Sequence, residues 1–322
     1  MKATAVAPAN IAFIKYWGKK NKVLRLPINS SISMNLSGLC TTTSVEFSST
    51  FIEDSVELIG DNFSVSEINR VKKSLDLIRK RAGIHEYADV VTKNTFPKGA
   101  GAAASASGFA ALTLAGFAAA GVSLTEKELT IFARLGSGSA CRSIPDGFVL
   151  WKEGETSEES FAYSLYPSTY WDIRDILVIV DASMKKVSTT KGMEDVHTSP
   201  LLVGRLEVLP GRVKRVEQTL KDKDFSSLGE VVEEDCLDMH AVMQSQNPPI
   251  YYWNEMTKKI MASVVGWRAG GLPVYFTIDA GPNVHILCEG KNAERVMEKA
   301  KLLDSIQSII MNKPSQGAHL LS

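Results

Sequence analysis

The chain has 322 residues, with 36 basic and 36 acidic side chains and 44% hydrophobic residues. This hydrophobic share is typical of globular proteins and excludes a disordered or fibrous chain. A formal net charge of zero argues against a nucleic-acid binder, which needs many uncompensated cations, but not against a small anionic ligand held by a local cluster. At about 150 residues per domain, the length suggests two lobes, and one large α+β unit is equally compatible with it.

The first part of the chain predicts several strands and a helix. A strand is expected at residues 4–6, followed by an irregular loop. Alternating polar and apolar residues predict strands at 31–36 and 41–47, with Gly38 marking a turn between them. Apolar residues at helical spacing then predict a helix over 65–82.

A glycine-rich loop at 97–103 leads into an alanine-rich helix, with Ser105 or Ser107 at its cap or in its first turn. Glycines let the backbone approach an anion, and a helix N-terminus offers free N–H groups. The loop lacks the Gly-Lys-Ser/Thr of a Walker A motif, and a run of glycine and alanine is equally typical of tight helix packing. A second helix is expected at 126–135.

The second part of the chain predicts one buried strand, long helices and a hairpin. The strand covers 176–180, and helical patterns follow at 201–220 and 228–245. The segments VYFTID and VHILCE on either side of AGPN predict a hairpin over 274–289. We therefore expect an α+β protein with a second lobe that begins just after the buried strand.

Three features of the sequence carry potential chemistry. The small residues at 136–143 expose backbone N–H groups and hydroxyl groups, and Arg142 can bind a carboxylate or phosphate through two parallel hydrogen bonds. The segment 10–20 mixes aromatic residues with cations, as a phosphate-binding wall or an amphipathic surface does. Asp279 is either a turn-stabilising carboxylate or a general base at a rigid strand end.

The cysteines and the apolar segments bear on the compartment. The four cysteines, at positions 40, 141, 236 and 288, form no CxxC pair and no zinc-site spacing, which is typical of buried thiols in a reduced, cytoplasmic protein. Pro8, Asn10 and Lys15 interrupt the N-terminal apolar run before it reaches signal-peptide length. The stretch 108–122 is shorter than the ~20 residues of a membrane span, so we expect no membrane contact.

A combination of six segments is more specific than any one of them. In chain order they read APANIAFIKYWGK, LPINSSISMNL, GSGSACRS, TSPLL, PPIYYWN and FTIDAGPNVHIL. Together they span most of the chain and resemble the mevalonate diphosphate decarboxylase family of the GHMP kinase superfamily. The resemblance implies a GHMP-kinase-like α+β fold with a ribosomal S5 domain 2-like N-terminal lobe over 1–182 and a ferredoxin-like C-terminal lobe over 183–322. It also implies a site between the lobes and a homodimer.

The implied activity is the decarboxylation of a phosphorylated mevalonate in isoprenoid biosynthesis, with ATP and Mg²⁺. A tertiary C3 hydroxyl is a poor leaving group, so it is first phosphorylated. Loss of this phosphate then gives C3 positive character, and the C1 carboxylate departs as carbon dioxide. The site must therefore hold several negative oxygens and keep C3 in a dry, apolar space.

The resemblance also assigns roles to residues of this chain. It gives Asp279 the deprotonation or orientation of the C3 hydroxyl and Arg142 the substrate carboxylate. Asn10 belongs to the hydrogen-bond network of Arg142, and Lys15 lies beside the reacting groups. The residues implied at the substrate phosphates are Tyr16, Lys19, Ser137, Gly138, Ser139, Thr190 and Lys191. The residues implied at the ATP phosphates are Lys98, Gly99, Gly101 and Ser105. No residue is implied as a metal ligand.

The phosphate-handling segments depart from the family pattern. The family loop reads close to P-T-A-A-G-L-A-S-S-A, whereas this chain has Ala104 at the first serine and an added cation at Lys98. Where bacterial relatives tend to have an arginine, the segment 185–193 carries threonine, with Lys191 as the expected substitute. Pro145-Asp146 replaces an aromatic-glycine pair. A lost hydroxyl costs ~1–3 kcal/mol, which weakens nucleotide binding without abolishing it.

ATP-dependent mevalonate diphosphate decarboxylation is therefore the prediction, and three alternatives stay open. The first is a decarboxylase that acts on mevalonate 3,5-bisphosphate without ATP, or on mevalonate 5-phosphate, and gives isopentenyl phosphate. The second is a kinase that phosphorylates C3 only, and the third is a non-catalytic binder of isoprenoid phosphates. Both of these are disfavoured because Lys15, Arg142 and Asp279 are retained. His240 and His285 belong to no metal-binding pattern, and we expect them to be structural.

Overall fold

The computed structural model describes residues 1–96, 104–181 and 187–321. The predicted ATP-loop residues Lys98, Gly99 and Gly101 lie outside the described residues, as does the expected lobe boundary at residue 182.

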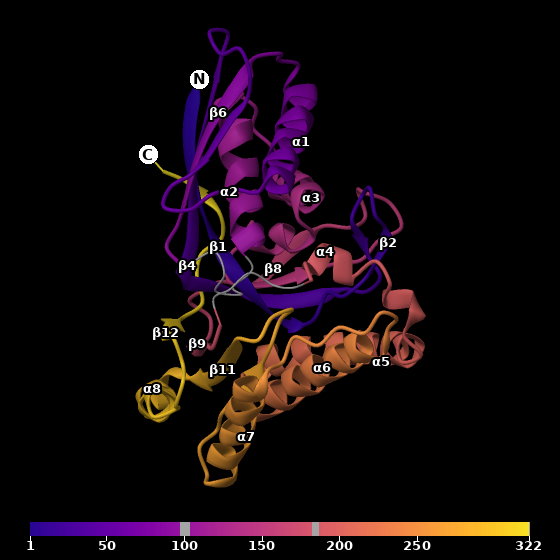
Figure 1. Cartoon of the computed structure of the whole chain (residues 1–322), viewed down its shortest axis with the longest axis vertical. Coiled ribbons are helices and arrows are strands. Elements are labelled where there is room, and N and C mark those ends of the chain that lie inside the picture. Colours follow the sequence, from indigo (N-terminus) through magenta and orange to yellow (C-terminus); the bar gives the residue numbers. More distant parts are fainter. Residues whose placement is uncertain (97–103, 182–186, 322) are drawn as a thin grey trace.

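A seven-stranded sheet dominates the N-terminal part of the protein (Figure 1). Its strands are β1 (Lys2–Ile14), β4 (Ser31–Ser48), β5 (Ser55–Leu58), β6 (Tyr87–Asn94), β7 (Phe148–Trp151), β8 (Ala162–Tyr166) and β13 (His319–Leu320). The order is β13-β1-β4-β6-β5, and β7 and β8 continue from β4. β1 pairs with β4 antiparallel almost from end to end. A separate ribbon is formed by β2 (Lys19–Asn21) and β3 (Leu26–Pro27).

Gly38 lies inside a strand, so the predicted turn was wrong. β4 runs unbroken past this residue because the segments on both sides of it pair with β1. The register shifts between the pairs Pro8–Cys40 and Ala9–Leu36, which marks a β-bulge. A Cβ atom on Gly38 would lie 2.8 Å from Asn312 Oδ1, so glycine permits this close approach. The irregular loop expected after residue 6 is also strand, because β1 continues to Ile14.

Three helices pack beside this sheet: α1 (Val65–Ala82), α2 (Ala104–Ala119) and α3 (Glu126–Gly136). α2 packs on β1 and β4, and α1 and α3 pack on α2 (Figure 1). α1 begins and ends at the predicted residues because Ser64 and Glu67 form a capping box and Gly83 adopts the left-handed conformation at its end. Ser105 lies in the first turn of α2, as predicted.

The C-terminal part has a four-stranded antiparallel sheet and most of the remaining helices. In order across the sheet, the strands are β10 (Tyr275–Thr277), β11 (Val284–Glu289), β9 (Ile173–Ile179) and β12 (Ser308–Asn312). The helices are α4 (Thr189–Gly192), α5 (Leu202–Asp222), α6 (Phe225–Ser245), α7 (Glu255–Ala269) and α8 (Ala293–Lys301). Of the 3-10 helices, η2 (Val196–Thr198) and η3 (Gly290–Asn292) belong to this part, whereas η1 (Gly138–Ser143) packs on α2 and α3 of the N-terminal part.

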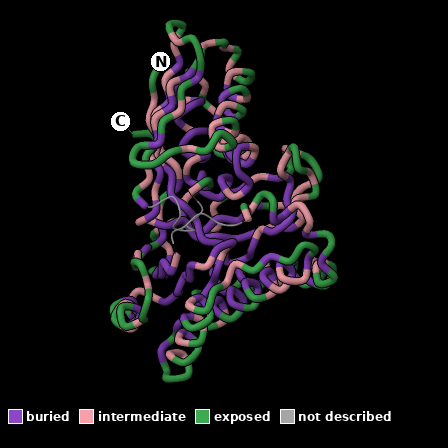
Figure 2. Tube along the Cα trace, viewed as in Figure 1, coloured by how far each residue is buried: buried purple, intermediate pink, exposed green. Residues whose placement is uncertain are grey.

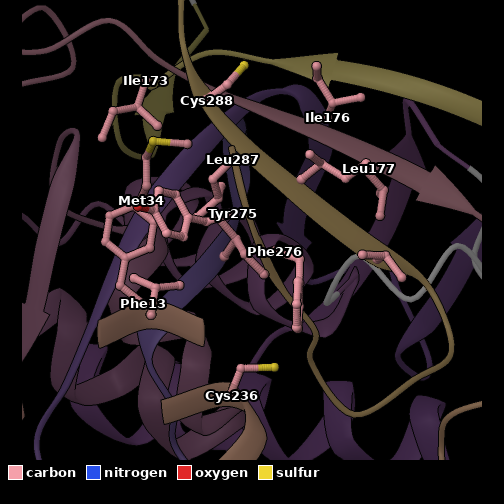
Figure 3. Packing of buried hydrophobic residues seen from close by; sticks show 14 of the residues in the cluster. Phe13, Met34, Ile173, Ile176, Leu177, Cys236, Tyr275, Phe276, Leu287 and Cys288 are labelled. Carbon is pink, nitrogen blue, oxygen red and sulfur yellow. The ribbon is translucent and has the colours of Figure 1, made fainter. Parts of the chain in front are cut away.

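The two sheets do not divide the chain at a single residue. β9 precedes residue 182 but belongs to the C-terminal sheet, and β13 at the other end of the chain pairs with β1. One hydrophobic core contains residues of both parts, including Phe13, Met34, Ile176 and Phe276 (Figure 3). Buried residues accordingly continue through the region where the two parts meet (Figure 2). This shared core fixes the end of β1 relative to the β10–β11 hairpin.

None of the helices in the described ranges has the length and apolar character needed to cross a bilayer. All four cysteines are free thiols, three of them buried and Cys40 partly exposed.

Candidate active site

The end of β1 and the β10–β11 hairpin meet at a buried ion pair. Lys15 directly follows β1, and Asp279 lies just beyond β10. Lys15 Nζ lies 2.6 Å from Asp279 Oδ1, although the two residues are 264 positions apart in the chain. The Lys15 side chain is 1% exposed and that of Asp279 is 27% exposed. The carboxylate is therefore held on one side by lysine and remains partly accessible to a ligand.

The hairpin turn that carries Asp279 is tied to the neighbouring strand. Asn283 Oδ1 accepts the backbone N–H groups of Val180 and Asp181 at 2.8 and 3.0 Å. Gly281 N–H donates to the carbonyl oxygen of Asp279 at 2.8 Å. The AGPN segment thus forms a turn that is fixed to the end of β9, and Asp279 sits on a rigid support.

Burial alone would raise the pKa of Asp279, but nearby cations outweigh it. Lys15 is the largest of these influences, and His285 and Arg142 add to it, so the pKa of Asp279 lies below its usual value. An opposite charge within a few ångströms favours the ionised form of a carboxyl group. Asp279 is therefore a carboxylate at neutral pH and can accept a proton from a hydroxyl group.

Arg142 enters the same region from η1. Its Nε and Nη2 donate to Asn10 Oδ1 at 3.2 and 3.1 Å, and its Nη1 donates to Ser31 Oγ at 2.8 Å. Asn10 Nδ2 in turn donates to the carbonyl oxygen of Ser139 and to Ser143 Oγ. Arg142 is 3% exposed, and no carboxylate of the described residues forms an ion pair with it. Neutral groups thus hold a buried guanidinium whose charge remains available to an anion.

A second group of cations lies on and around the β2–β3 ribbon. Burial, followed by the charge of Arg25, lowers the pKa of Lys19 to about 8. Burial and Arg25 also lower the pKa of Arg70 to about 10. Arg25 Nε donates to the carbonyl oxygen of Leu135 at 2.9 Å, and Arg70 Nη2 donates to that of Gly136 at 3.0 Å. Mutually repelling cations anchored in this way favour the binding of an anion such as a phosphate.

Tyr16 connects the two groups. Its ring packs edge to face on Trp151, with 4.6 Å between ring centroids, and both Arg25 and Arg142 influence its ionisation. Burial raises the pKa of Tyr16, so its hydroxyl group stays protonated. This hydroxyl is buried and has no hydrogen-bond partner among the described residues. Since buried polar groups are normally paired, Tyr16 is placed to donate to a ligand. Gly138 makes room for it, because a Cβ atom there would lie 2.7 Å from the hydroxyl.

The remaining predicted residues lie around these groups. Ser105 Oγ is 3.2 Å from Ser137 Oγ, so the first turn of α2 meets the end of α3. Thr190 and Lys191 are exposed on α4, and Lys191 Nζ pairs with Glu194 Oε2 at 2.8 Å instead of contacting the predicted cluster. Glu194 also influences the pKa of Lys19, which places α4 at the rim of the second group.

Several residues of the site carried no role in the sequence prediction. Ser31 lies in the LPINSSISMNL segment, but its contact with Arg142 depends on the pairing of distant segments. Arg25 and Arg70 lie outside the six segments that indicated the family. Asp235 is a carboxylate beside the apolar residues Val231, Val232 and Cys236 of a helix, and such an interruption is a usable signal of a buried polar contact.

The donor groups of the site bear on how Mg²⁺ would be held. The described residues contain no group of three or more His, Cys, Asp or Glu side chains arranged to hold a metal ion. Mg²⁺ commonly binds through substrate phosphates and only one or two carboxylates. Among the described residues, the site thus offers single carboxylates such as Asp279.

Comparison with known proteins identifies the family of the chain. Residues 7–162 match the model of the diphosphomevalonate decarboxylase-like N-terminal domain, and residues 176–317 match that of the mevalonate 5-diphosphate decarboxylase C-terminal domain. The chain belongs to the diphosphomevalonate decarboxylase family. The predicted family and α+β fold class are therefore confirmed.

Individual relatives and solved structures cover most of the chain. The diphosphomevalonate decarboxylases of Homo sapiens and Candida albicans are 38% and 37% identical, over 88% and 92% of this chain and 76% and 86% of theirs. The structure of mevalonate diphosphate decarboxylase from Staphylococcus aureus matches with a TM-score of 0.95 at 38% identity, covering 100% of this chain and 98% of that one. A structure of MDDEF in complex with MVAPP, AMPPCP and magnesium matches with a TM-score of 0.94 at 37% identity, covering 100% and 99%.

Proposed function

We propose that this protein is an ATP-dependent mevalonate diphosphate decarboxylase. It converts mevalonate 5-diphosphate and ATP into isopentenyl diphosphate, carbon dioxide, ADP and phosphate. The observation that carries the proposal is the Lys15–Asp279 pair at 2.6 Å, within electrostatic range of the buried Arg142. A base and a carboxylate-binding cation at one site suit a substrate that carries both a hydroxyl and a carboxylate group.

Asp279 accepts or orients the proton of the C3 hydroxyl group. The hydroxyl oxygen meanwhile attacks the γ-phosphorus of ATP, and the bond from this phosphorus to ADP breaks. Lys15 keeps the carboxylate ionised for this step. The C3–O bond then breaks and phosphate leaves with the bonding electrons. The C1–C2 bond breaks next, and its electrons form the C2–C3 double bond as carbon dioxide departs. Once any proton that it has accepted has passed to a phosphate oxygen, Asp279 is again negative and stabilises positive charge that develops at C3.

Arg142 holds the C1 carboxylate, and Asn10 and Ser31 fix the plane of its guanidinium. This contact sets the C1–C2 bond in a defined orientation relative to C3. Correct orientation of reacting groups can contribute several orders of magnitude to a rate.

The diphosphate of mevalonate 5-diphosphate binds at the second group of cations. Lys19, Arg25 and the hydroxyl of Tyr16 suit the 5-diphosphate, as do Ser137, Gly138 and Ser139. Thr190 and Lys191 would reach it from the rim. For ATP we propose Lys98, Gly99, Gly101 and Ser105. Bound with the nucleotide, Mg²⁺ supplies neutralisation of phosphate charge. In support, the related MDDEF structure holds MVAPP, AMPPCP and magnesium.

One experiment separates this function from its alternatives. Purified protein is incubated with mevalonate 5-diphosphate, 5-phosphate or 3,5-bisphosphate, each with and without ATP–Mg²⁺, and carbon dioxide and phosphorylated products are measured. We expect carbon dioxide only from the 5-diphosphate with ATP. A phosphorylated product without gas would indicate a kinase, and binding without turnover would indicate a binding protein.

The specific alternative rests on Ala104, which replaces a serine of the family loop, and on the added cation Lys98. If ATP binding is lost, the 3,5-bisphosphate alone should give carbon dioxide and isopentenyl phosphate, whether or not ATP is present. Turnover of the 5-phosphate with ATP would instead indicate a phosphomevalonate decarboxylase.

We also infer a homodimer of two-lobed subunits, with the lobes divided near residue 182, in a reducing compartment such as the cytoplasm. The four free cysteines support the compartment. Light scattering after size exclusion tests the assembly: a dimer has twice the 35.1 kDa mass of the chain, and a single-chain mass would contradict it.

A further inference from the structure

Side chains of helix α6 hold the backbone at Lys15 and at Ile278, the residue before Asp279. Asp235 is completely buried, and its Oδ2 accepts the backbone N–H of Lys15 at 2.7 Å. The next residue, Cys236, accepts the N–H of Ile278 on its sulfur at 3.1 Å. One turn further, His240 Nε2 lies 3.4 Å from the carbonyl oxygen of Ile278. Because Ile278 immediately precedes Asp279, one helix face holds both partners.

The contact of Asp235 with Lys15 is separable from helix packing. Asp235 also pairs with Arg205 and Arg212 of α5, at 3.0 and 3.5 Å. Asp238 pairs with the same two arginines, at 3.0 and 2.5 Å, but within the described residues it forms no hydrogen bond with Lys15 or Ile278. Arg205 and Arg212 therefore keep Asp238 as a carboxylate partner when Asp235 is replaced, whereas the Lys15 N–H loses its acceptor.

We propose that α6 is the positioning element of the reaction centre, with Asp235 as a positioning residue for Lys15 and Cys236 and His240 as positioning residues for Asp279. The inference rests on the proposed function, because it assigns these residues to the Lys15–Asp279 pair. A carboxylate buried against a backbone N–H fixes the start of the lysine side chain. The contacts of Cys236 and His240 with Ile278, which together form a clamp, fix the backbone from which the Asp279 side chain extends.

A positioning element matters because the interaction between Lys15 and Asp279 depends strongly on their distance. Releasing the Lys15 backbone lets its ammonium group move away from Asp279, and a displacement of about 1 Å at a reacting group can cost roughly 100-fold in rate. A weaker Lys15 contact also returns the pKa of Asp279 toward its ordinary value, since Lys15 is its strongest cationic influence. The acid limb of the rate profile then moves to higher pH.

The test compares Asp235→Ala and Asp235→Asn with the matched control Asp238→Asn. We expect Asp235→Ala to lower kcat roughly 10- to 100-fold, to leave the KM for ATP within about 2-fold, and to shift the acid limb of kcat upward. Asp235→Asn should recover part of this loss, because its amide oxygen still accepts the Lys15 N–H. Asp238→Asn removes a partner of the same arginines and should keep the wild-type kcat and pH profile. Equal losses in kcat for Asp235→Ala and Asp238→Asn would overturn the proposal.

Hydrogen exchange reports on the contact between Asp235 and the Lys15 N–H without any need for turnover. Hydrogen exchange of a peptide that covers residues 11–18 should quicken in Asp235→Ala and stay at the wild-type rate in Asp238→Asn; unchanged exchange in Asp235→Ala would overturn the proposal. If wild-type protein releases no carbon dioxide from any substrate, the proposed function fails, and exchange still decides whether Asp235 holds Lys15.

A second pair of variants covers failure of the Asp235 variants to fold. Cys236→Ala removes the acceptor of the Ile278 N–H, and we expect kcat to fall several-fold with little change in the KM for ATP. Cys236→Ser should recover part of the rate, because its hydroxyl oxygen is also an acceptor. Equal rates in Cys236→Ala and the wild type would show that this half of the clamp does not position Asp279.

Discussion

The two ends of the proposed site, a proposed reaction end and a proposed phosphate end, are built in opposite ways. At the reaction end, Lys15, Asp279 and Arg142 have protein partners, so their geometry is set before a ligand arrives. At the phosphate end, cations stand close together and the Tyr16 hydroxyl has no partner among the described residues. The reaction end is thus preorganised for chemistry, whereas the phosphate end stores electrostatic repulsion that a polyanion relieves.

This contrast suggests a division between rate and affinity. Preorganised charges lower the barrier of the chemical step because they need no rearrangement during reaction. Repelling cations contribute mainly to binding, because their interaction with a diphosphate is present before and during the reaction. Variants at the reaction end should therefore act on kcat, and variants at the phosphate end on KM.

The largest effect is expected for Asp279→Asn. The amide cannot accept the C3 hydroxyl proton, and general-base groups contribute roughly 10²- to 10⁴-fold, so we expect kcat to fall about 1,000-fold with little change in substrate KM. Steady-state release of carbon dioxide measures this. Asp304→Asn, at an exposed position of the same half, should behave as wild type. An active Asp279→Asn protein would break the assignment of the reaction end.

Arg142→Lys should have the next largest effect. A lysine has one nitrogen and cannot contact Asn10, Ser31 and a carboxylate in the same plane as a guanidinium does. We expect kcat/KM to fall about 100-fold, mostly through kcat, in steady-state assays. The control Arg295→Lys changes an exposed arginine. A loss seen only in KM would place Arg142 with the phosphate end instead.

Gly138→Ala should act on affinity. The added Cβ would lie 2.7 Å from the ring and hydroxyl of Tyr16, which cannot move freely because it packs on Trp151. We expect the KM for mevalonate 5-diphosphate to rise about 10-fold, because one hydrogen bond from Tyr16 to a charged group is lost. The kcat should stay nearly unchanged. Gly266→Ala, where the Cβ meets open space, serves as the control. A kcat loss of the same size would contradict the division between an end that acts on kcat and an end that acts on KM.

The smallest effect concerns pH. The pKa of Lys19 is lowered to about 8, so free protein loses this positive charge as pH rises through that value. Substrate KM should then rise several-fold between pH 7.5 and about 9, while kcat changes less because bound phosphate restores the proton. Lys19→Arg stays protonated and should move this rise to higher pH. An alkaline limb identical in both proteins would exclude Lys19 as its source.

The sequence predicted those parts of the fold that are encoded locally. The helix at 65–82 was predicted in full because its capping box and terminal glycine lie next to it in the chain. The hairpin that carries Asp279 was predicted from period-two alternation around AGPN. Gly38 was misassigned because a glycine can mark a turn or a bulge, and only the pairing of β4 with β1 distinguishes them.

The sequence by itself determined most element types and the family, and it supplied the candidate site residues, because side-chain periodicity, helix caps and motif order depend on residues that are neighbours in the chain. Only the tertiary structure decided that Lys15 meets Asp279 across 264 positions, that Arg25 and Arg70 gather around Lys19, and that Asp235 supports Lys15. These contacts form because a shared hydrophobic core brings separate strands and helices together. No local pattern records which buried surfaces will meet.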